Sequence, residues 1–467
     1  MRNFRWLAGI NLTVKPLWLF FLFYSARVLG PNQFGEYMLA LSYVSLVYSI
    51  LEGGIDIFTV RELSTGRKEF QHLFPNTMFI KAVSGLGTVC VVIILSMVLL
   101  SSTVPSIILI YGGLYIVAYS LTTHARYIFR AFEVLKYEAI SIFIEKIAVV
   151  SLCLLALLLE KSAVIFMAAF SIGYLITCIV TLFILLKKIG LPQWRITWKY
   201  LWNEVILPAL PYALMSFLMV VYFRSATVMI KLLIGNEGII GYYNAGYRLV
   251  EAFILFPSMV IAPLYPVFAR RNAEKSYIGT LALNSTRIIT VVSLSICLLF
   301  ILLSREFTQL VYGEEFLPAV NAIRFLPIAM VPIGLTWVFG TLVAASGRQW
   351  RANFYLLGIT IANIVGHLIM IPSYGLMGAI SVTLATECAV AITNIWIMRD
   401  YINYKFLLLL LKFTIPPVVL YLFYLANIIF GSFILKLLIV FLILSVIYVS
   451  LRLISLREIK NVFFSKS

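Results

Sequence analysis

The chain has 467 residues, of which 62% are hydrophobic and only 12% are charged, and its mean hydropathy is +1.02. Soluble globular proteins are about half apolar and about a quarter charged, so this composition excludes an ordinary soluble domain. Apolar runs of about twenty residues recur along the chain, which excludes a membrane β-barrel with its alternating segments of about ten residues. We therefore expect an all-α polytopic membrane protein.

Fourteen membrane-spanning helices are expected in chain order. Several of them exceed the length that a bilayer needs, and these are expected to tilt or to protrude. The expected spans cover residues 10–29, 35–58, 75–100, 105–124, 137–159, 162–186, 205–234, 239–265, 280–303, 317–345, 351–371, 375–398, 405–429 and 432–454.

Basic residues alternate between the connections that join these spans. Connections on one side hold 23 Lys and Arg residues, whereas those on the other hold only Arg27, Lys161 and Arg305. Because Lys and Arg remain in the cytoplasm during insertion, both termini are expected to be cytoplasmic. The net charge of +17 is thus mostly a topology signal, with some attraction to anionic lipid headgroups, and it does not indicate a nucleic-acid partner.

No pattern typical of catalysis or of metal binding occurs in the sequence. The five cysteines and three histidines are scattered singly, without metal-ligand spacing, so we expect neither a metal site nor disulfides. Catalytic triads, P-loops and Rossmann glycine patterns are absent. We expect a transporter without a cofactor rather than an enzyme.

Fifteen charged residues are expected inside the spans. A charge exposed at the bilayer centre costs about 3 kcal/mol. The four charges that lie well inside their spans, Arg224, Arg248, Glu251 and Glu387, would together cost roughly 12 kcal/mol, which is comparable with the stability of a whole domain. These charges are therefore expected to face one another or water in a polar cavity within the bundle. The fifteen residues are Lys15, Lys81, Lys146, Arg224, Lys231, Arg248, Arg287, Arg324, Lys412 and Lys436, with Glu52, Asp56, Glu145, Glu251 and Glu387.

Some of these charges also have a purely structural interpretation. Asp56, Lys436 and Lys231 lie near span ends, where side chains can reach the membrane surface. Glu145 and Lys146 are adjacent in sequence and are expected not to face one another, so each needs another partner.

Features recur at offsets of 195 to 206 residues along the chain. Pro16 in span 1 corresponds to Pro211 in span 7, and the turns after both spans contain glycine and tyrosine. Because six spans return the chain to the same side, residues 1–200 and 201–400 are expected to be parallel repeats. Transporters built in this way bind substrate at the interface of the repeats and alternate between two openings. Residues 401–467 are expected to add spans 13 and 14 and a cytoplasmic tail.

Five short segments carry a family resemblance. They are RVLGPNQFGEY (27–37), GIIGYYNAGYRL (238–249), LVYGEEFLPAV (310–320), SGRQ (346–349) and IPSYGLMGAISVTLATE (371–387). In this order they resemble the polysaccharide flippases, the Wzx-type (O-antigen) branch of the multidrug/oligosaccharidyl-lipid/polysaccharide exporter superfamily. The resemblance covers residues 10 to about 400.

This resemblance implies a two-lobed fold of fourteen helices with a central cleft, in the bacterial cytoplasmic (inner) membrane. It implies movement of undecaprenyl-diphosphate-linked oligosaccharide repeat units to the periplasmic leaflet, for surface polysaccharide of the O-antigen (lipopolysaccharide) or capsule type. The implied partners are this lipid-linked oligosaccharide, membrane lipids and polysaccharide polymerase or chain-length proteins, with the flippase itself a monomer. Many relatives carry Asp in span 7 where this chain has Tyr222-Phe223-Arg224-Ser225, which favours a cationic scheme here.

A lipid diphosphate carries about two negative charges, and Arg or Lys side chains can replace its hydration by charge-assisted hydrogen bonds. Arg224 and Arg248 are expected to bind the diphosphate or anionic sugars. The further candidates are Lys15, Lys81, Arg324 and Lys231.

Coupling to a gradient of H⁺ or Na⁺ would need carboxylates inside the spans. The candidates are Glu387, Glu251 and Glu52, and each of them could instead pair with a base. At i,i+3, Arg248 and Glu251 share a helix face, so Arg248 either binds substrate or pairs with Glu251.

Three other functions remain open. A peptidoglycan lipid-precursor flippase would share the fold and a cationic cavity. A multidrug antiporter would need an acidic cavity, whereas bases inside the spans outnumber acids ten to five. A polytopic glycosyltransferase or polysaccharide polymerase would need a sizeable catalytic loop, and the longest connections have only about fifteen to twenty residues.

Overall fold

The computed structural model describes residues 2–52, 54–64, 66, 69–98, 106–190, 195–271, 273–402, 404–425, 433–451 and 453. Throughout these ranges the chain forms helices and turns, and no strand. Two compact units divide the chain, Met1–Gly241 (unit 1) and Tyr242–Ser467 (unit 2). The expected repeat boundary near residue 200 concerns internal similarity rather than compactness, so it stays a prediction.

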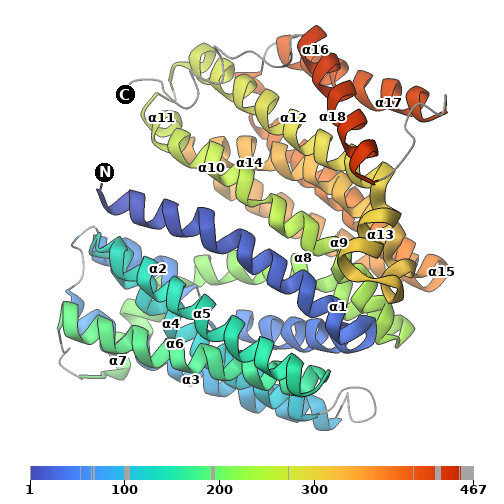
Figure 1. The fold of residues 1–467 in the computed structure, drawn as a ribbon. Coiled ribbons are helices and arrows are strands. Elements are labelled where there is room, and N and C mark those ends of the chain that lie inside the picture. Colours follow the sequence, from blue (N-terminus) through green and yellow to red (C-terminus); the bar gives the residue numbers. More distant parts are fainter. Residues whose placement is uncertain are drawn as a thin grey trace. The chain divides into compact units, whose positions relative to one another are not determined.

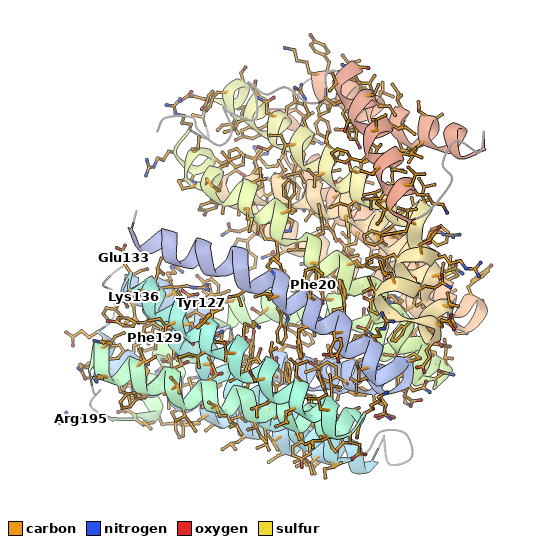
Figure 2. All side chains as sticks on the ribbon, in the orientation of Figure 1. Phe20, Tyr127, Phe129, Glu133, Lys136 and Arg195 are labelled. Atoms are coloured by element: carbon orange, nitrogen blue, oxygen red, sulfur yellow. The ribbon has the colours of Figure 1, made fainter. Side chains whose placement is uncertain are left out.

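Unit 1 is a bundle of long helices. In chain order they are α1 (Arg2–Glu52), α2 (Ile55–Ser64), α3 (Phe70–Val98), α4 (Ser106–Ala131), α5 (Leu135–Leu159), α6 (Ala163–Ile189), α7 (Trp198–Tyr200), the π-helical turn η1 (Leu201–Ile206) and α8 (Leu207–Ile234). Helix α6 packs along both α4 and α5, and α3 packs along α4 (Figure 1). Figure 2 shows Glu133, Lys136 and Arg195 at the same end of this unit. The first two follow the fourth expected span and Arg195 follows the sixth, so all three were expected on one side of the membrane.

Helix α1 contains the first two expected spans. They meet at a kink at Gly30, whose φ of 74° lies in the left-handed region that glycine tolerates. Pro31 follows, and its ring suits a position where a new helix begins. The second span is then interrupted at Gly54 (φ 63°), after which α2 begins. Expected span 35–58 is therefore a helix followed by a break.

Two of the segments that carried the family resemblance contact one another inside unit 1. A Cβ added to Gly35 would overlap the backbone of Glu237, and one added to Gly241 would overlap the backbone of Pro31. Each glycine thus lets the backbone of the other segment approach closely. The reciprocity of this contact explains why the chain repeats a glycine-containing turn.

Unit 2 is also entirely helical in its described part. Its helices are α9 (Glu237–Phe253, which begins in unit 1), α10 (Leu255–Ile261), η2 (Ala262–Leu264), α11 (Tyr265–Arg270), α12 (Lys275–Phe307), η3 (Thr308–Tyr312), η4 (Glu314–Ala319), α13 (Val320–Phe325), η5 (Leu326–Ala329), α14 (Met330–Ala345), α15 (Gln349–Ile397), η6 (Arg399–Tyr401), α16 (Tyr404–Lys412), α17 (Ile415–Leu425) and α18 (Phe433–Ser450). Helix α15 is kinked at Gly375 (φ 55°), which separates expected spans 11 and 12.

The SGRQ segment forms the turn between α14 and α15. Arg348 donates from Nη1 to the carbonyl of Ile397 at 2.8 Å and from Nη2 to Asp400 at 3.1 Å. The hydrogen bond from Arg348 lowers the pKa of the Asp400 carboxyl. The arginine therefore ties the start of α15 to its far end.

Eleven helices in the described part of the chain are long and apolar enough to cross a membrane. Helices α1 and α15 each contain two of the expected spans, and only expected span 405–429 has no counterpart among the eleven. That segment forms the shorter α16 and α17, and residues 426–429 lie outside the described residues. The expectation of an all-α polytopic membrane protein is confirmed.

Candidate functional site

Lys81 of α3 is the centre of a buried charged group in unit 1. Its side chain is 0% exposed, and its Nζ lies 2.7 Å from Glu52 Oε1 and 2.9 Å from Asp56 Oδ2. Nζ also donates to the Tyr48 hydroxyl at 3.2 Å. The last residue of α1 and the second residue of α2 thus contact the same lysine, on either side of the break at Gly54.

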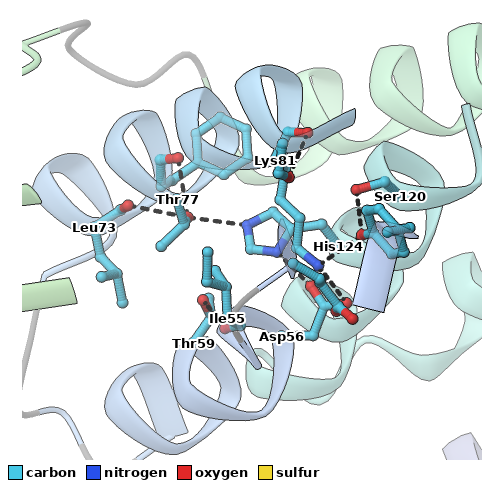
Figure 3. Close-up of polar contacts among 12 residues, drawn as sticks. Ile55, Asp56, Thr59, Leu73, Thr77, Lys81, Ser120 and His124 are labelled. Atoms are coloured by element: carbon cyan, nitrogen blue, oxygen red, sulfur yellow. Dashed lines mark hydrogen bonds and ion pairs between the residues drawn. The ribbon is translucent and has the colours of Figure 1, made fainter. Parts of the chain in front are cut away.

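His124 of α4 completes this arrangement (Figure 3). Its Nδ1 lies 2.7 Å from Asp56 Oδ1, and its Nε2 lies 2.9 Å from the Thr77 hydroxyl. We call Glu52, Asp56, Lys81 and His124 the Lys81 group. Two carboxylates face one lysine, so the group carries a net charge of −1 when the imidazole is neutral and is balanced when one proton is added.

The Thr77 hydroxyl permits either state of the imidazole. This hydroxyl lies 3.1 Å from the carbonyl of Leu73, to which it can donate, and it would then accept from a doubly protonated His124. Turned towards Nε2, it would donate to a neutral ring instead. His124 can therefore gain or lose a proton without losing a hydrogen-bond partner.

A second charged group surrounds Glu145 of α5. Its Oε1 accepts from Lys146 Nζ at 2.6 Å and from the Tyr174 hydroxyl at 3.1 Å. Arg126 Nη1 lies 2.7 Å from Glu145 Oε2 and forms an ion pair with it. We call Arg126, Glu145, Lys146 and Tyr174 the Glu145 group. Two cations share one carboxylate, so the group carries a net charge of +1.

Arg126 has an unsatisfied donor. Its Nε donates to the Ser141 hydroxyl at 2.9 Å, but its Nη2 is buried and has no hydrogen-bond partner in the described part of the chain. Buried polar atoms without partners are uncommon, and a guanidinium nitrogen is a strong donor to phosphate and carboxylate oxygens. Arg126 thus presents an unused donor beside an excess positive charge.

Aromatic rings surround this positive group. Lys146 Nζ lies 3.7 Å from the centre of the Trp18 ring of α1, in a cation–π contact. The Tyr115 ring lies 4.8 Å from that of Tyr174 and 5.1 Å from that of Phe170. Arg224 of α8 is partly exposed and interacts electrostatically with Tyr115. Five helices therefore contribute cations and rings to one region of unit 1.

The remaining sequence candidates lie in different surroundings. Arg248 pairs with Glu251 on α9, as the structural alternative for this pair predicted. Lys231 pairs with Glu237 across the turn at Gly235.

In unit 2, Arg324 donates from Nε to the Ser304 hydroxyl at 3.1 Å, and Glu387 is buried in α15. The side chain of Lys15 lies outside the described residues.

Three structural expectations were wrong. Asp56 was expected to reach the membrane surface, but it is buried, because Lys81 and His124 offer it partners there. Lys231 was also placed near a span end, but it is buried and pairs with Glu237. Lys436 pairs with Glu306 at 2.6 Å and stays partly exposed, so its expected reach to the surface stays a prediction. Glu145 and Lys146 do contact one another, because the long lysine stem folds back onto the neighbouring carboxylate.

Sequence reasoning missed His124, Arg126 and Trp18. His124 lies 68 residues from Asp56, so no spacing rule connects them. Arg126 was placed in a connection, but α4 continues past it to Ala131. In the part of the chain that the structure describes, no group of three or more His, Cys, Asp or Glu residues could hold a metal ion.

Comparisons with known proteins agree with this fold. The lipid II flippase MurJ, in an inward closed conformation, matches with a TM-score of 0.73 at 15% identity, covering 98% of this chain and 99% of that one. An inward-facing multidrug resistance MATE family transporter of the MOP superfamily matches with a TM-score of 0.62 at 14% identity, covering 86% and 98%. At these identities the likeness shows the fold alone.

Sequence comparisons identify the family. The teichuronic acid biosynthesis protein TuaB of Bacillus subtilis (strain 168) is 28% identical over 135 residues, which are 29% of this chain and 28% of that protein. The match thus spans less than a third of that curated relative. Residues 1–272 match the model of the family described as "Polysaccharide biosynthesis protein". This match covers more than half of the chain, which therefore belongs to the polysaccharide biosynthesis protein family.

Proposed function

We propose that the chain is a flippase that moves undecaprenyl-diphosphate-linked oligosaccharide repeat units from the cytoplasmic to the outer leaflet, for surface polysaccharide biosynthesis. It would work by alternating access, as a monomer in the bacterial cytoplasmic membrane with both termini cytoplasmic. The family match and the TuaB relative support a role in polysaccharide biosynthesis. The fold shared with a lipid II flippase is consistent with transport of a lipid-linked saccharide. A polysaccharide polymerase would then take over the delivered unit.

The unused donor of Arg126 is the observation that carries this proposal. The donor belongs to the Glu145 group, in which two cations share one carboxylate, and this group lies within helices that are expected to span the membrane. A diphosphate offers several anionic oxygens, each of which makes strong hydrogen bonds to guanidinium. The neighbouring rings offer flat apolar surfaces against which a sugar can pack. Positive charge beside aromatic rings is thus the chemistry that a diphosphate-linked sugar requires.

Within the proposed site, Arg126, Lys146 and Arg224 contact the substrate. Arg126 and Lys146 share one carboxylate, whereas Arg248, Lys231 and Lys81 each pair with at least one carboxylate of their own. These last three are therefore assigned to structure rather than to the first contact with the diphosphate. No bond is broken in the substrate, so no nucleophile or general base is needed. A drug antiporter would instead need an acidic site for its cationic substrates.

We propose that the Lys81 group couples this transport to a proton gradient through Glu52, Asp56 and His124. A buried group with a net charge is costly, and one added proton balances it. The energetics therefore favour uptake of a proton when the group is closed from water and release when it opens. Glu251 and Glu387 remain weaker candidates for coupling, the first because it is paired with Arg248.

The test is a leaflet-exposure assay of the lipid-linked oligosaccharide in cells depleted of this protein. In depleted cells the repeat unit is expected to accumulate in the cytoplasmic leaflet. Expression of the wild-type chain is expected to restore its transfer to the outer leaflet. Arg126→Gln is expected to slow this transfer by about tenfold to a hundredfold, since a hydrogen bond to a charged group contributes about 1.5–3 kcal/mol. Lys136→Gln, which removes an exposed lysine at the end of unit 1, is the matched control.

Normal exposure in depleted cells that have no other such transporter would refute the flippase proposal. Exposure of lipid II rather than of the polysaccharide unit would favour the peptidoglycan alternative. Normal transport by Arg126→Gln at normal expression would remove this arginine from the site while leaving the flippase proposal intact.

A further inference from the structure

Unit 1 contains a pocket of about 490 Å³ that is separate from both charged groups. It lies between the first turns of α3 and the segment 195–204, at the end of the unit where Figure 2 shows Arg195. Charge alternation predicts this end to be cytoplasmic. The lining residues used below are His72, Asn76, Arg195, Lys199, Tyr200 and Glu204.

The segment that closes this pocket is held by its apolar face. Leu201, Val205 and Ala209 recur every four residues and are buried. Val205 and Ala209 belong to a core cluster with residues of α2 and α3. Trp198 and Trp202, also four residues apart, are exposed. Because tryptophan concentrates where membrane and water meet, this face places the pocket at the depth of lipid headgroups.

The pocket favours an anion. Arg195 and Lys199 are exposed cations in its lining, and Glu204 is the one carboxylate among the residues that line it. Burial, followed by the nearby Glu204 and Glu62, raises the pKa of the Tyr200 phenol, which therefore keeps its proton. The lining thus combines two cations with groups that hydrogen-bond to hydroxyls.

Asn76 adds a requirement for a hydroxyl donor. It is only 2% exposed, and its Nδ2 donates to the carbonyls of His72 at 2.7 Å and Arg195 at 3.3 Å. Two carbonyl acceptors fix the nitrogen on that side, so the oxygen must point the other way. That Oδ1 is buried and has no hydrogen-bond partner among the described residues. A ligand that fills the pocket would satisfy it by donating a hydroxyl.

We propose that this pocket binds a phosphate diester that carries free hydroxyl groups, namely the phosphoglycerol headgroup of phosphatidylglycerol. Arg195 and Lys199 hold the phosphate, and the glycerol hydroxyl donates to Asn76 Oδ1. The same chemistry occurs in lipid-linked phosphosugars, so the transported substrate is the other source to be distinguished. This inference does not rest on the proposed function, because a lipid can bind here whatever the chain transports.

The experiment measures lipids retained by the full-length chain in native mass spectrometry after release from phosphatidylcholine vesicles that contain a minor fraction of phosphatidylglycerol. The double variant R195Q/K199Q is expected to retain about 25-fold less phosphatidylglycerol, because each basic residue near a lipid surface contributes about a factor of five. The control R270Q/K275Q removes two exposed cations of unit 2 and is expected to retain the wild-type amount.

A second measurement tests the hydroxyl on the wild-type chain. Phosphatidylethanol keeps the charged diester and lacks hydroxyls, so it is expected to be retained about fivefold less than phosphatidylglycerol. Equal retention of the two lipids would overturn the role of Asn76. Equal losses in R195Q/K199Q and R270Q/K275Q, or no loss in either, would overturn the pocket as a specific site.

Undecaprenyl diphosphate is the probe for the other source. The proposal expects it not to displace phosphatidylglycerol from the wild-type chain. Displacement that disappears in R195Q/K199Q would show that the pocket takes the transported class of lipid, and the assignment to a membrane phospholipid would then be wrong.

Discussion

The Lys81 group and the Glu145 group lie in the same unit and have opposite imbalances of charge. In the first, one lysine that is 0% exposed contacts two carboxylates, and a histidine contacts one of these carboxylates. In the second, one carboxylate serves Arg126 and Lys146, whose side chains are 12% and 20% exposed. The lysine of the acidic group is thus closed, although Glu52 at the edge of that group is 19% exposed, whereas both cations of the basic group retain contact with their surroundings. By the exposure of these cations we call the first group closed and the second open.

This difference shows how one helix bundle can bind a cation and an anion at separate sites. A buried imbalance of charge is costly, so it persists where a mobile ion corrects it during function. An excess of one negative charge is corrected by one proton, which needs no space. An excess positive charge with an unused guanidinium donor suits a larger anion that enters from outside. The two groups therefore fit a coupling ion and a substrate, respectively.

Replacing the lysine of the closed group should have the largest effect on stability. Lys81→Met removes the charge at similar volume and leaves the buried Asp56 and the partly buried Glu52 without their shared cation. We expect a loss of about 3–5 kcal/mol, as for other buried ion pairs that lose one partner. Thermal unfolding of the purified chain in detergent is the measurement.

A double variant separates charge from packing. Adding Asp56→Asn to Lys81→Met removes one of the two unpaired acids and should restore part of the lost stability. If the double variant is no more stable than Lys81→Met alone, the loss comes from packing and the comparison between the two groups fails.

Removing the acid of the open group should cost less. Glu145→Gln leaves Arg126 and Lys146 without their carboxylate, but both can reach more polar surroundings. We expect a loss of about 1–3 kcal/mol, the range for hydrogen bonds to a charged group, and retained binding of undecaprenyl diphosphate. The same unfolding assay, with lipid retention beside it, tests this. A loss as large as that of Lys81→Met would mean that both groups are closed.

His124 tests the role of the proton in the closed group. His124→Gln keeps an amide that can reach Asp56 and Thr77 but cannot take up a proton, so the stability should change by only about 1 kcal/mol. Transport in proteoliposomes should then no longer respond to an imposed proton gradient.

The control for this variant is His367→Gln. His367 is buried in α15, and no carboxylate contacts it among the described residues. Its replacement should leave the gradient response intact. Equal responses in wild type and His124→Gln would exclude His124 from coupling.

Features set by local sequence were predictable. Apolar runs placed the spans, since a helix needs about twenty apolar residues to cross a bilayer. The pairing of Arg248 with Glu251 was one of two stated alternatives, because residues at i,i+3 share a helix face. The five motif segments predicted the family.

Contacts between distant segments were not predictable from one sequence. Lys81 lies 29 residues from Glu52, and the two meet because α1 packs against α3. Arg126 seemed to lie in a connection, because the charges of Arg126 and Arg130 hide the continuation of α4. Helix ends depend on packing as well as on composition, and a charge that tertiary partners satisfy can extend a span.

The contact between Lys146 and Trp18 should have the smallest effect and distinguishes an ordered cation from a mobile one. Trp18→Leu removes the ring beneath Nζ, and the cation–π contact should contribute about 0.5–1 kcal/mol at this partly exposed site. A double-mutant cycle with Lys146→Gln separates that coupling from the lost apolar area. The stability losses of the two single variants differ in sum from the loss of the double variant only by the energy of the contact between the two residues. Trp18→Phe should keep part of it, since a smaller ring attracts a cation more weakly. A coupling energy of zero would mean that the lysine moves freely, and the open group would then recognise its anion by charge without a fixed geometry.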